Sequence, residues 1–253
     1  MLHYAANGLS GGTDLLIAHG LFGSARNWGV LSKRLSDSRR VVTVDMRNHG
    51  ASPWFETNTY ADLAVDLAGV IHATGGAADV LGHSMGGKAG MVLALTRPDL
   101  VNRLIIADIA PVAYTHTQKH LIAAMQAVDL SQVSSRRDAD SQLMDAVSDD
   151  GVRAFLLQSL DLKGDAPRWA LNLDVLDTEM PGIIGFPEVE GRFDGPCLFL
   201  SGGLSGYVKP SDRPKIRALF PQAEFGEIEG AGHWLHAEKP REFQGAVRAF
   251  LDR

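Results

Sequence analysis

Cysteine is nearly absent from this chain, and long apolar runs are absent altogether. The single cysteine among 253 residues, Cys197, excludes an internal disulfide framework and fits a reducing compartment. It lies within an apolar run, so we expect a buried small hydrophobe there. No apolar run approaches the roughly 20 residues that a membrane-spanning helix needs, and no signal-peptide pattern is visible. These features predict a cytoplasmic protein without a membrane span.

Clusters of positive charge are also missing. The formal net charge is −6 and no Lys/Arg-rich block occurs, which argues against a nucleic-acid partner. There is no dinucleotide-binding fingerprint and no phosphate-binding lysine loop. The histidines at positions 3, 72, 116 and 120 show no metal-ligand spacing with carboxylates or with each other. We therefore expect neither a cofactor nor a metal ion.

Short apolar runs alternate with amphipathic stretches, and hydrophobic residues make up 45% of the chain, enough for a sizeable core. Near-continuous apolar runs are typical of strands buried on both faces of a parallel sheet. Strands are predicted at 15–18, 41–44, 78–81, 104–107 and 197–200, with a weaker one at 224–228. Helices are predicted at 27–35, 60–73, 87–96, 211–220 and 241–251. This order predicts an α/β fold with a doubly wound, mostly parallel sheet, whose ligands bind at the carboxyl ends of the strands.

The alternation of strands and helices stops between about residues 111 and 190. This stretch holds helical patterns and no convincing strand. Ser135 is expected to begin one helix and Asp150 to cap another. We predict that residues 1–112 and 191–253 form the α/β core, and that residues 113–190 form a helical cap insertion over the strand tips.

The most informative motif is Gly-His-Ser-Met-Gly at residues 82–86. It follows a predicted strand and precedes a predicted helix, which is the setting in which a Gly-x-Ser-x-Gly motif presents a nucleophile. The serine occupies a strained turn, and residues two positions before and after it would collide if they carried side chains. We therefore predict that Ser84 is a nucleophile.

A serine nucleophile requires a base, and the best candidate is His233. His233 lies in a glycine-rich loop at 230–236, directly after the last predicted strand, so it can reach the serine. His236 is the competing candidate. Because Gly230 and Gly232 lie just before His233 and allow a tightly turned, exposed position, we assign the base to His233 and expect His236 to support the loop or the following helix.

The base needs an acid to fix its tautomer. In such folds the acid commonly follows the strand at 197–200, but the loop at 201–207 contains no carboxylate. Asp212 comes too late and is expected to begin a helix. Asp108 ends the strand at 104–107, which should neighbour the serine strand at about 4.8 Å. We predict that Asp108 is the acid, although a structural role as the partner of a backbone amide remains open.

The oxyanion of an acyl-transfer intermediate also needs hydrogen-bond donors. The segment His-Gly-Leu-Phe-Gly-Ser at 19–24 follows the first strong strand, and its glycines allow a backbone amide to face the site. We predict that the amides of Phe22 and Met85 form the oxyanion hole. Loss of one such donor typically lowers the rate by about 10²–10³-fold.

With these motifs in this order, the chain resembles an α/β-hydrolase over essentially its whole length. The segments at 108–112 and 230–240 are similar to those of small bacterial YbfF-type serine esterases, whose acid follows the strand after the nucleophile. The resemblance implies hydrolysis of carboxylic esters, and of acyl thioesters such as acyl-CoA, as small-molecule substrates. Ser84 would attack the carbonyl while His233 takes its proton.

Two further points follow from this interpretation. The helical insertion would supply the acyl pocket, with Trp169, Leu173 and Ile184 as candidate lining residues. The same catalytic set is also compatible with a carbon–carbon bond hydrolase or a perhydrolase. A slow or non-catalytic ligand receptor of the same fold is the alternative from a different class.

Overall fold

The computed structural model of the chain describes residues 1–9 and 11–253, and its centre is a seven-stranded sheet. The strand order is β1-β3-β2-β4-β5-β8-β9, and every neighbouring pair is parallel except β1 with β3. The strands are β1 (Tyr4–Asn7), β2 (Leu15–Ala18), β3 (Val41–Val44), β4 (Ala78–His83), β5 (Val101–Ala107), β8 (Cys197–Gly202) and β9 (Ala223–Ile228). The predicted α/β fold class, with a doubly wound and mostly parallel sheet, is confirmed.

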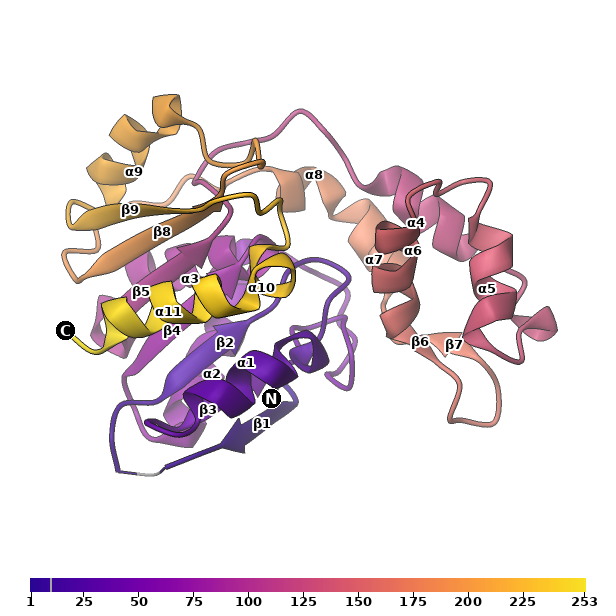
Figure 1. The fold of residues 1–253 in the computed structure, drawn as a ribbon, viewed down its shortest axis with the longest axis horizontal. Coiled ribbons are helices and arrows are strands. Elements are labelled where there is room, and N and C mark those ends of the chain that lie inside the picture. Colours follow the sequence, from indigo (N-terminus) through magenta and orange to yellow (C-terminus); the bar gives the residue numbers. More distant parts are fainter. Residues whose placement is uncertain (10) are drawn as a thin grey trace.

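Helices cover both faces of this sheet. α1 (Gly29–Leu35) and α11 (Pro240–Leu251) lie in front of it in Figure 1, whereas α2 (Tyr60–Thr74) and α3 (Met85–Thr96) lie behind. α9 (Arg213–Leu219) contributes to the same core as α2 and α3. The central strands are fully buried because their side chains enter one core or the other on alternate faces.

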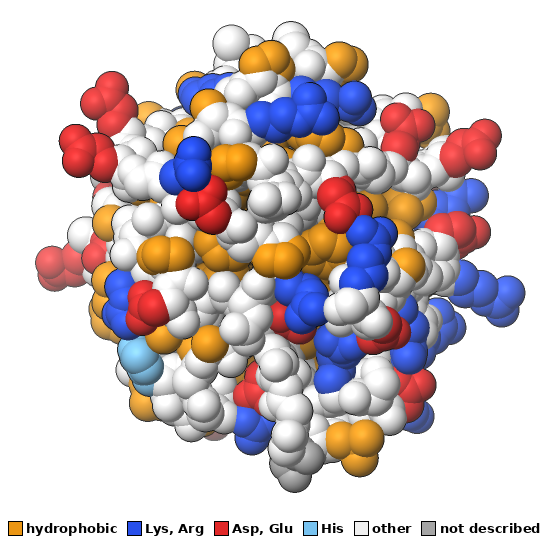
Figure 2. Space-filling model, turned by 90° about the vertical axis from the view of Figure 1, so that its left-hand side faces the viewer, with side chains coloured by type: hydrophobic (Ala, Val, Ile, Leu, Met, Phe, Trp, Pro, Cys, Tyr) orange, Lys and Arg blue, Asp and Glu red, His pale blue; other side chains and the backbone are white. Residues whose placement is uncertain are grey.

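The predicted core strands and helices are all present, with ends that differ by a few residues. The edge strand β1 was not predicted. Its side chains are exposed or half-buried and it contains no apolar run, so the signal that reveals buried strands is missing. Figure 2 shows the side of the molecule on which the C-terminus lies, where acidic and basic side chains are interspersed around apolar ones.

The chain between β5 and β8 forms a separate, mostly helical group beside the sheet (Figure 1). Its helices are α4 (Lys119–Gln126), α5 (Arg136–Leu143), α6 (Asp150–Leu156), α7 (Leu173–Thr178) and α8 (Met180–Ile184). Contrary to expectation it also contains a two-stranded sheet, β6 (Leu160–Asp161) and β7 (Arg168–Trp169), whose strands are too short to produce a periodic pattern. The remaining short helices are α10 (Leu235–Glu238) and 3₁₀ turns at Ala25–Trp28, Pro98–Leu100, Leu130–Gln132, Leu157–Ser159 and Pro210–Asp212.

Two helix starts in this group test the predicted caps. Ser135 caps α5 as expected, because its hydroxyl accepts the N–H of Asp138. The cap of α6 falls one residue earlier than predicted, since the Asp149 carboxylate accepts the N–H of Val152 at 2.8 Å. Across residues 1–9 and 11–253, no helix is both long enough and apolar enough to cross a membrane.

Candidate active site

Ser84 occupies a strained turn between β4 and α3. Its backbone has φ +52° and ψ −117°, a region that non-glycine residues rarely adopt. A Cβ on Gly82 would lie 2.3 Å from the Gly86 carbonyl oxygen, and one on Gly86 would lie 2.4 Å from that of Ala18. Both positions therefore require glycine, as predicted, and the turn holds the serine above the sheet.

Strand pairing brings Asp108 next to this turn. β4 and β5 are adjacent and parallel, with His83 opposite Ala107, and the N–H of Ser84 donates to the Ala107 carbonyl at 3.1 Å. Ser84 and Asp108 are the next residues after their respective strands, so both follow the same edge of the sheet. Asp108 also has a positive φ, +52°, and is fully buried.

The Asp108 carboxylate is completely engaged. Its Oδ2 lies 2.7 Å from His233 Nδ1 and accepts the hydroxyl of Ser205, and its Oδ1 accepts the N–H of Gly202 at 3.0 Å. The two interpretations of Asp108 are thus not exclusive, because one oxygen binds a backbone amide while the other faces His233. Ser205 and Gly202 belong to β8 and the loop after it, where the acid is more commonly found.

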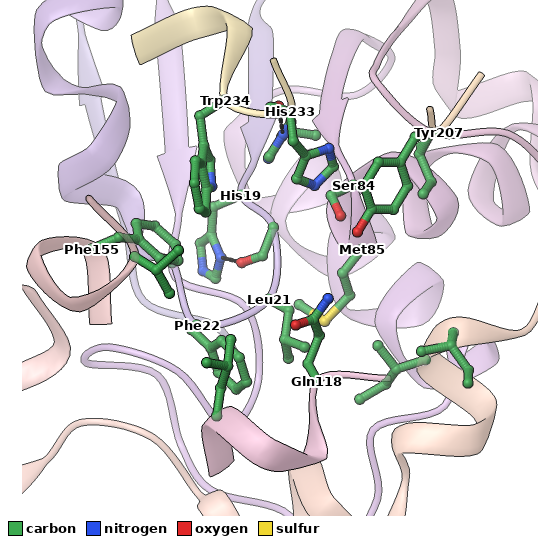
Figure 3. Close-up of a pocket in the computed structure, with 18 of the residues that line it drawn as sticks. His19, Leu21, Phe22, Ser84, Met85, Gln118, Phe155, Tyr207, His233 and Trp234 are labelled. Carbon is green, nitrogen blue, oxygen red and sulfur yellow. Dashed lines mark hydrogen bonds between the residues drawn. The ribbon is translucent and has the colours of Figure 1, made fainter. Parts of the chain in front are cut away.

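Other side chains besides Asp108 lie close to His233. The Tyr207 ring stacks on it with the centroids 4.0 Å apart and the planes 20° apart. His83 donates its Nε2–H to the His233 carbonyl at 2.9 Å, which ties the histidine loop to the residue before the nucleophile. Ser84, Tyr207 and His233 line one cavity, and Figure 3 shows the Ser84 hydroxyl beside the rings of His233 and Tyr207.

His236, which was expected to support the loop or the following helix, packs against aromatic rings. Its ring stacks on Trp28 with centroids 4.2 Å apart. Burial, with a smaller contribution from the nearby His233, lowers the pKa of His236 to about 3. Burial likewise brings the pKa of His83 well below the ordinary value for histidine, with added contributions from His233 and His236. Both rings are therefore neutral at physiological pH.

In the loop at 19–24, the backbone N–H of Phe22, which was expected to face the oxyanion, already has a hydrogen-bond partner. The N–H of Phe22 donates to His49 Nε2 at 3.3 Å, and His49 Nδ1–H donates to the Arg47 carbonyl at 2.8 Å. The Phe22 amide is thus already used. Gly23 N–H donates to the Gly20 carbonyl at 3.0 Å and Phe22 has φ +63°, which defines a type II turn with Leu21 at its second position.

Backbone N–H groups without an acceptor also lie at this edge of the sheet. Among the residues that the structure describes, the N–H groups of Leu21 and Met85 have no hydrogen-bond acceptor. Met85 is the first residue of α3, where the backbone N–H has no partner within the helix. Leu21, rather than Phe22, is therefore the better partner for Met85. The signal that could have found it is the turn itself, in which the second residue keeps its amide free.

His19 fixes the same loop through hydrogen bonds of both ring nitrogens. The Met46 N–H donates to His19 Nε2 at 2.9 Å, and His19 Nδ1–H donates to the Gly20 carbonyl at 2.8 Å. Both ring nitrogens are used, and burial lowers the pKa of this histidine. His19 therefore orders the loop as a neutral ring.

A cavity of about 540 Å³ extends from Ser84 between the sheet and the helical group. Of the three candidate lining residues, Ile184 lines this cavity, together with Ile183, Phe155 and Trp234 among others. Trp169 and Leu173 do not take part: both are buried in the hydrophobic core, and Trp169 donates its indole N–H to the Met125 carbonyl at 2.9 Å. Apolar spacing marks a buried face but does not distinguish a packed face from one that lines a cavity.

The other carboxylate considered for the acid, Asp212, has a local structural role. Asp212 precedes α9 and accepts the N–H of Lys209 at 2.9 Å, which is a local role at a helix start. Within the described residues, no three His, Cys, Asp or Glu side chains are grouped so that they could hold a metal ion.

The sheet order and the strained serine turn define the class of α/β hydrolases. The profile of the alpha/beta hydrolase fold matches residues 15–240, and the chain belongs to this family. It is 44% identical over 247 residues to the sn-1-specific diacylglycerol lipase ABHD11 of Mus musculus, covering 94% of this chain and 80% of the relative. It is 40% identical over 243 residues to esterase YbfF of Escherichia coli (strain K12), covering 95% and 93% of the two chains.

Solved structures give the same result. A structure described as a marine microorganism esterase is 37% identical to this chain, superposes with a TM-score of 0.94 and covers 98% of both chains. The similarity therefore includes the helical group as well as the sheet.

Proposed function

We propose that this protein is a serine hydrolase that cleaves carboxylic esters through an acyl-enzyme on Ser84. The observation that carries the proposal is the arrangement of three side chains at one edge of the sheet. There a strained serine and a histidine line the same cavity, and the histidine lies 2.7 Å from a buried carboxylate. Relatives named as esterases and a lipase, at 35–44% identity, support the same chemistry.

In the first step the Ser84 hydroxyl attacks the ester carbonyl and gives its proton to His233 Nε2. Asp108 keeps the proton on Nδ1, so that Nε2 is free to accept. The carboxylate then stabilises the imidazolium, and the face of Tyr207 stacked on the ring contributes a further attraction for that cation.

The negative charge that develops on the carbonyl oxygen is stabilised by the N–H groups of Leu21 and Met85. The amino end of α3 adds a partial positive charge at the same place. These donors are fixed by the turn and by the helix, so they need no rearrangement as the charge appears. This assignment replaces the Phe22 amide with that of Leu21 and keeps Met85.

The second step reverses the roles. His233 gives its proton to the leaving alcohol as the ester C–O bond breaks, which leaves the acyl group on Ser84. Water then attacks the acyl carbon and gives a proton to His233. His233 returns this proton to Ser84 Oγ as the carboxylic acid is released. The acyl group occupies the cavity, whose lining includes apolar side chains such as Ile183, Ile184 and Phe155. A small-molecule ester with an apolar acyl chain is the substrate class that fits.

Two substrate questions belong to the same proposal. An acyl thioester such as acyl-CoA presents the same carbonyl to Ser84 and a better leaving group. A glycerolipid ester is favoured by the name of the Mus musculus relative, a diacylglycerol lipase. We infer a cytoplasmic site of action from the sequence pattern described above.

The test is a substrate panel with the wild type and Ser84→Ala. It comprises p-nitrophenyl esters of increasing acyl length, a diacylglycerol and acyl-CoAs, with a β-diketone and hydrogen peroxide as probes of the alternative chemistries. We expect ester turnover that falls by at least about 10³-fold in the variant. Turnover of none of these by the wild type contradicts the proposal, and preferential cleavage of a β-diketone or formation of a peracid identifies the alternative chemistries.

A further inference from the structure

Lys88 is a buried lysine that the proposed reaction does not use. It lies one turn along α3 from the nucleophile, with its backbone N–H donating to the Ser84 carbonyl at 3.0 Å, and the residue is only 1% exposed. Burial lowers the pKa of its side-chain amine to about 7. Because a buried ammonium group is costly unless polar groups surround it, the contacts of Lys88 indicate what it holds.

Those contacts are the carbonyl oxygens at the end of α8. The Lys88 ammonium donates to the carbonyls of Ile184 at 2.9 Å and of Gly185, with Ile183 at 3.5 Å. The last carbonyls of a helix have no partner within it, and a positive side chain is favoured there. The rings of Tyr114 and Tyr60, with centroids 4.8 Å and 5.7 Å from Nζ, add aromatic faces to the cage.

The same short segment is held by two further bonds. The Tyr60 hydroxyl donates to the Ile183 carbonyl at 2.6 Å, and the N–H of Tyr114 donates to the Ile184 carbonyl at 3.0 Å. Tyr114 lies where the chain leaves the core for the helical group, and Ile184 lies where it returns. Both ends of the insertion therefore meet at Lys88.

This junction is connected to the candidate active site in three ways. Lys88, Tyr60 and Tyr114 themselves line the cavity. Ile183 and Ile184, whose carbonyls it holds, line the cavity next to Ser84. The Tyr114 hydroxyl donates to the Tyr207 carbonyl at 2.7 Å, and Tyr207 is the residue stacked on His233. A shift of the junction therefore moves both the cavity wall and the aromatic face against His233.

We propose that Lys88 is a positioning residue. It ties both ends of the helical insertion to the nucleophile helix and so fixes the cavity wall formed by Ile183 and Ile184 against the acyl chain. Lys88 does not act as a proton carrier, because its ammonium N–H groups point to backbone carbonyls and not to Ser84. The expected effect on ester kinetics rests on the proposed function, whereas the positioning of the insertion by Lys88 does not.

The kinetic test compares Lys88→Met with the wild type on p-nitrophenyl acetate and octanoate. Methionine fills a similar volume but donates no hydrogen bond, so the three carbonyls lose their shared donor. We expect the octanoate-to-acetate ratio of kcat/KM to fall by about tenfold, the effect of losing the contacts of one or two methylene groups. Lys33→Met, which removes an exposed lysine of α1, is the matched control and should leave the ratio unchanged.

Tyr60→Phe provides a second variant in case Lys88→Met does not fold. It removes only the hydroxyl that donates to Ile183, and we expect a smaller shift of the ratio in the same direction. An equal loss of activity on both esters, or an unchanged ratio in folded variants, overturns the proposal. Either result would show that the junction does not shape the acyl end of the cavity.

Hydrogen exchange tests the junction without any substrate. In Lys88→Met the amide of Tyr114, which donates to Ile184, should exchange at least about tenfold faster than in the wild type, while amides of β2 and β4 keep their rates. An unchanged Tyr114 rate contradicts the proposal. If the wild type cleaves no ester but Tyr114 behaves as expected, the proposed function fails and the positioning role stands.

Discussion

Replacing Asp108 with asparagine is the change whose consequence the hydrogen bonds define most closely. The Gly202 N–H donates to Oδ1 at 3.0 Å, so the amide oxygen of the substituted side chain must occupy that position. The amide NH₂ then replaces Oδ2 and faces His233 Nδ1 and the Ser205 hydroxyl. A donor opposite Nδ1 forces the ring proton onto Nε2, where the ring cannot accept the proton of Ser84.

The expected loss is large because two effects combine. The ring adopts the wrong tautomer, and the imidazolium loses its buried counter-charge. The equivalent change in a well-studied Ser-His-Asp triad lowers kcat by about 10⁴-fold, which corresponds to about 5 kcal/mol at the transition state. We expect Asp108→Asn to lose about 10³–10⁴ in kcat, with a smaller effect on KM.

The assay is steady-state hydrolysis of p-nitrophenyl butyrate, with circular dichroism as the check on folding. Asp212→Asn is the matched control, since that carboxylate accepts the local N–H of Lys209 at a helix start, and the activity of this variant should stay within about twofold of the wild type. If Asp108→Asn keeps more than a tenth of the activity while Asp212→Asn loses most of it, the assignment of the acid is wrong.

Two other predictions concern the oxyanion hole and acid stability. Leu21→Pro removes one N–H at a turn position that proline favours, so kcat should fall by about 10²–10³-fold, whereas Leu21→Ala keeps the amide and most activity; equal activity of the two variants argues against this donor. Burial lowers the pKa of His49 and His236 to about 3 and also lowers those of His19 and His83. Below about pH 6.5 the unfolded chain therefore binds more protons than the folded protein. As the pH falls through this range, the free energy of unfolding should decrease by up to about 1.4 kcal/mol per pH unit for each of these histidines. Urea denaturation between pH 7 and 5 measures this slope, and His49→Asn should reduce it by one proton; an unchanged slope contradicts the buried neutral state of His49.

The sheet was predictable because its strands are buried on both faces. Apolar runs such as Leu15–Ala18 and Val41–Val44 have no polar alternation, and that signal survives in a single sequence. The side chains of the edge strand Tyr4–Asn7 are half-buried or exposed, so this strand gives no such signal. The placement of Asp108 beside Ser84 followed from strand order alone, since one helix separates their strands along the chain.

The parts that the sequence did not reveal depend on contacts between distant segments. The Phe22 amide is engaged by His49, a residue from a different loop, so the choice between neighbouring amides is invisible to a local pattern. Trp169 has the apolar character of a cavity wall but is used for packing. Lysine is a residue type that usually lies at the surface, and only the fold shows that Lys88 is buried against α8.

The central claim is that Ser84 carries the acyl group, and a covalent adduct tests it most directly. The measurement is peptide mass spectrometry after reaction with a fluorophosphonate probe, which modifies activated serines, and after rapid quenching of p-nitrophenyl butyrate turnover. The account predicts a phosphonyl group and a butyryl group on the peptide that contains Ser84, both lost in Ser84→Ala. Ester turnover with no adduct at Ser84, or equal labelling of Ser84→Ala, would contradict it.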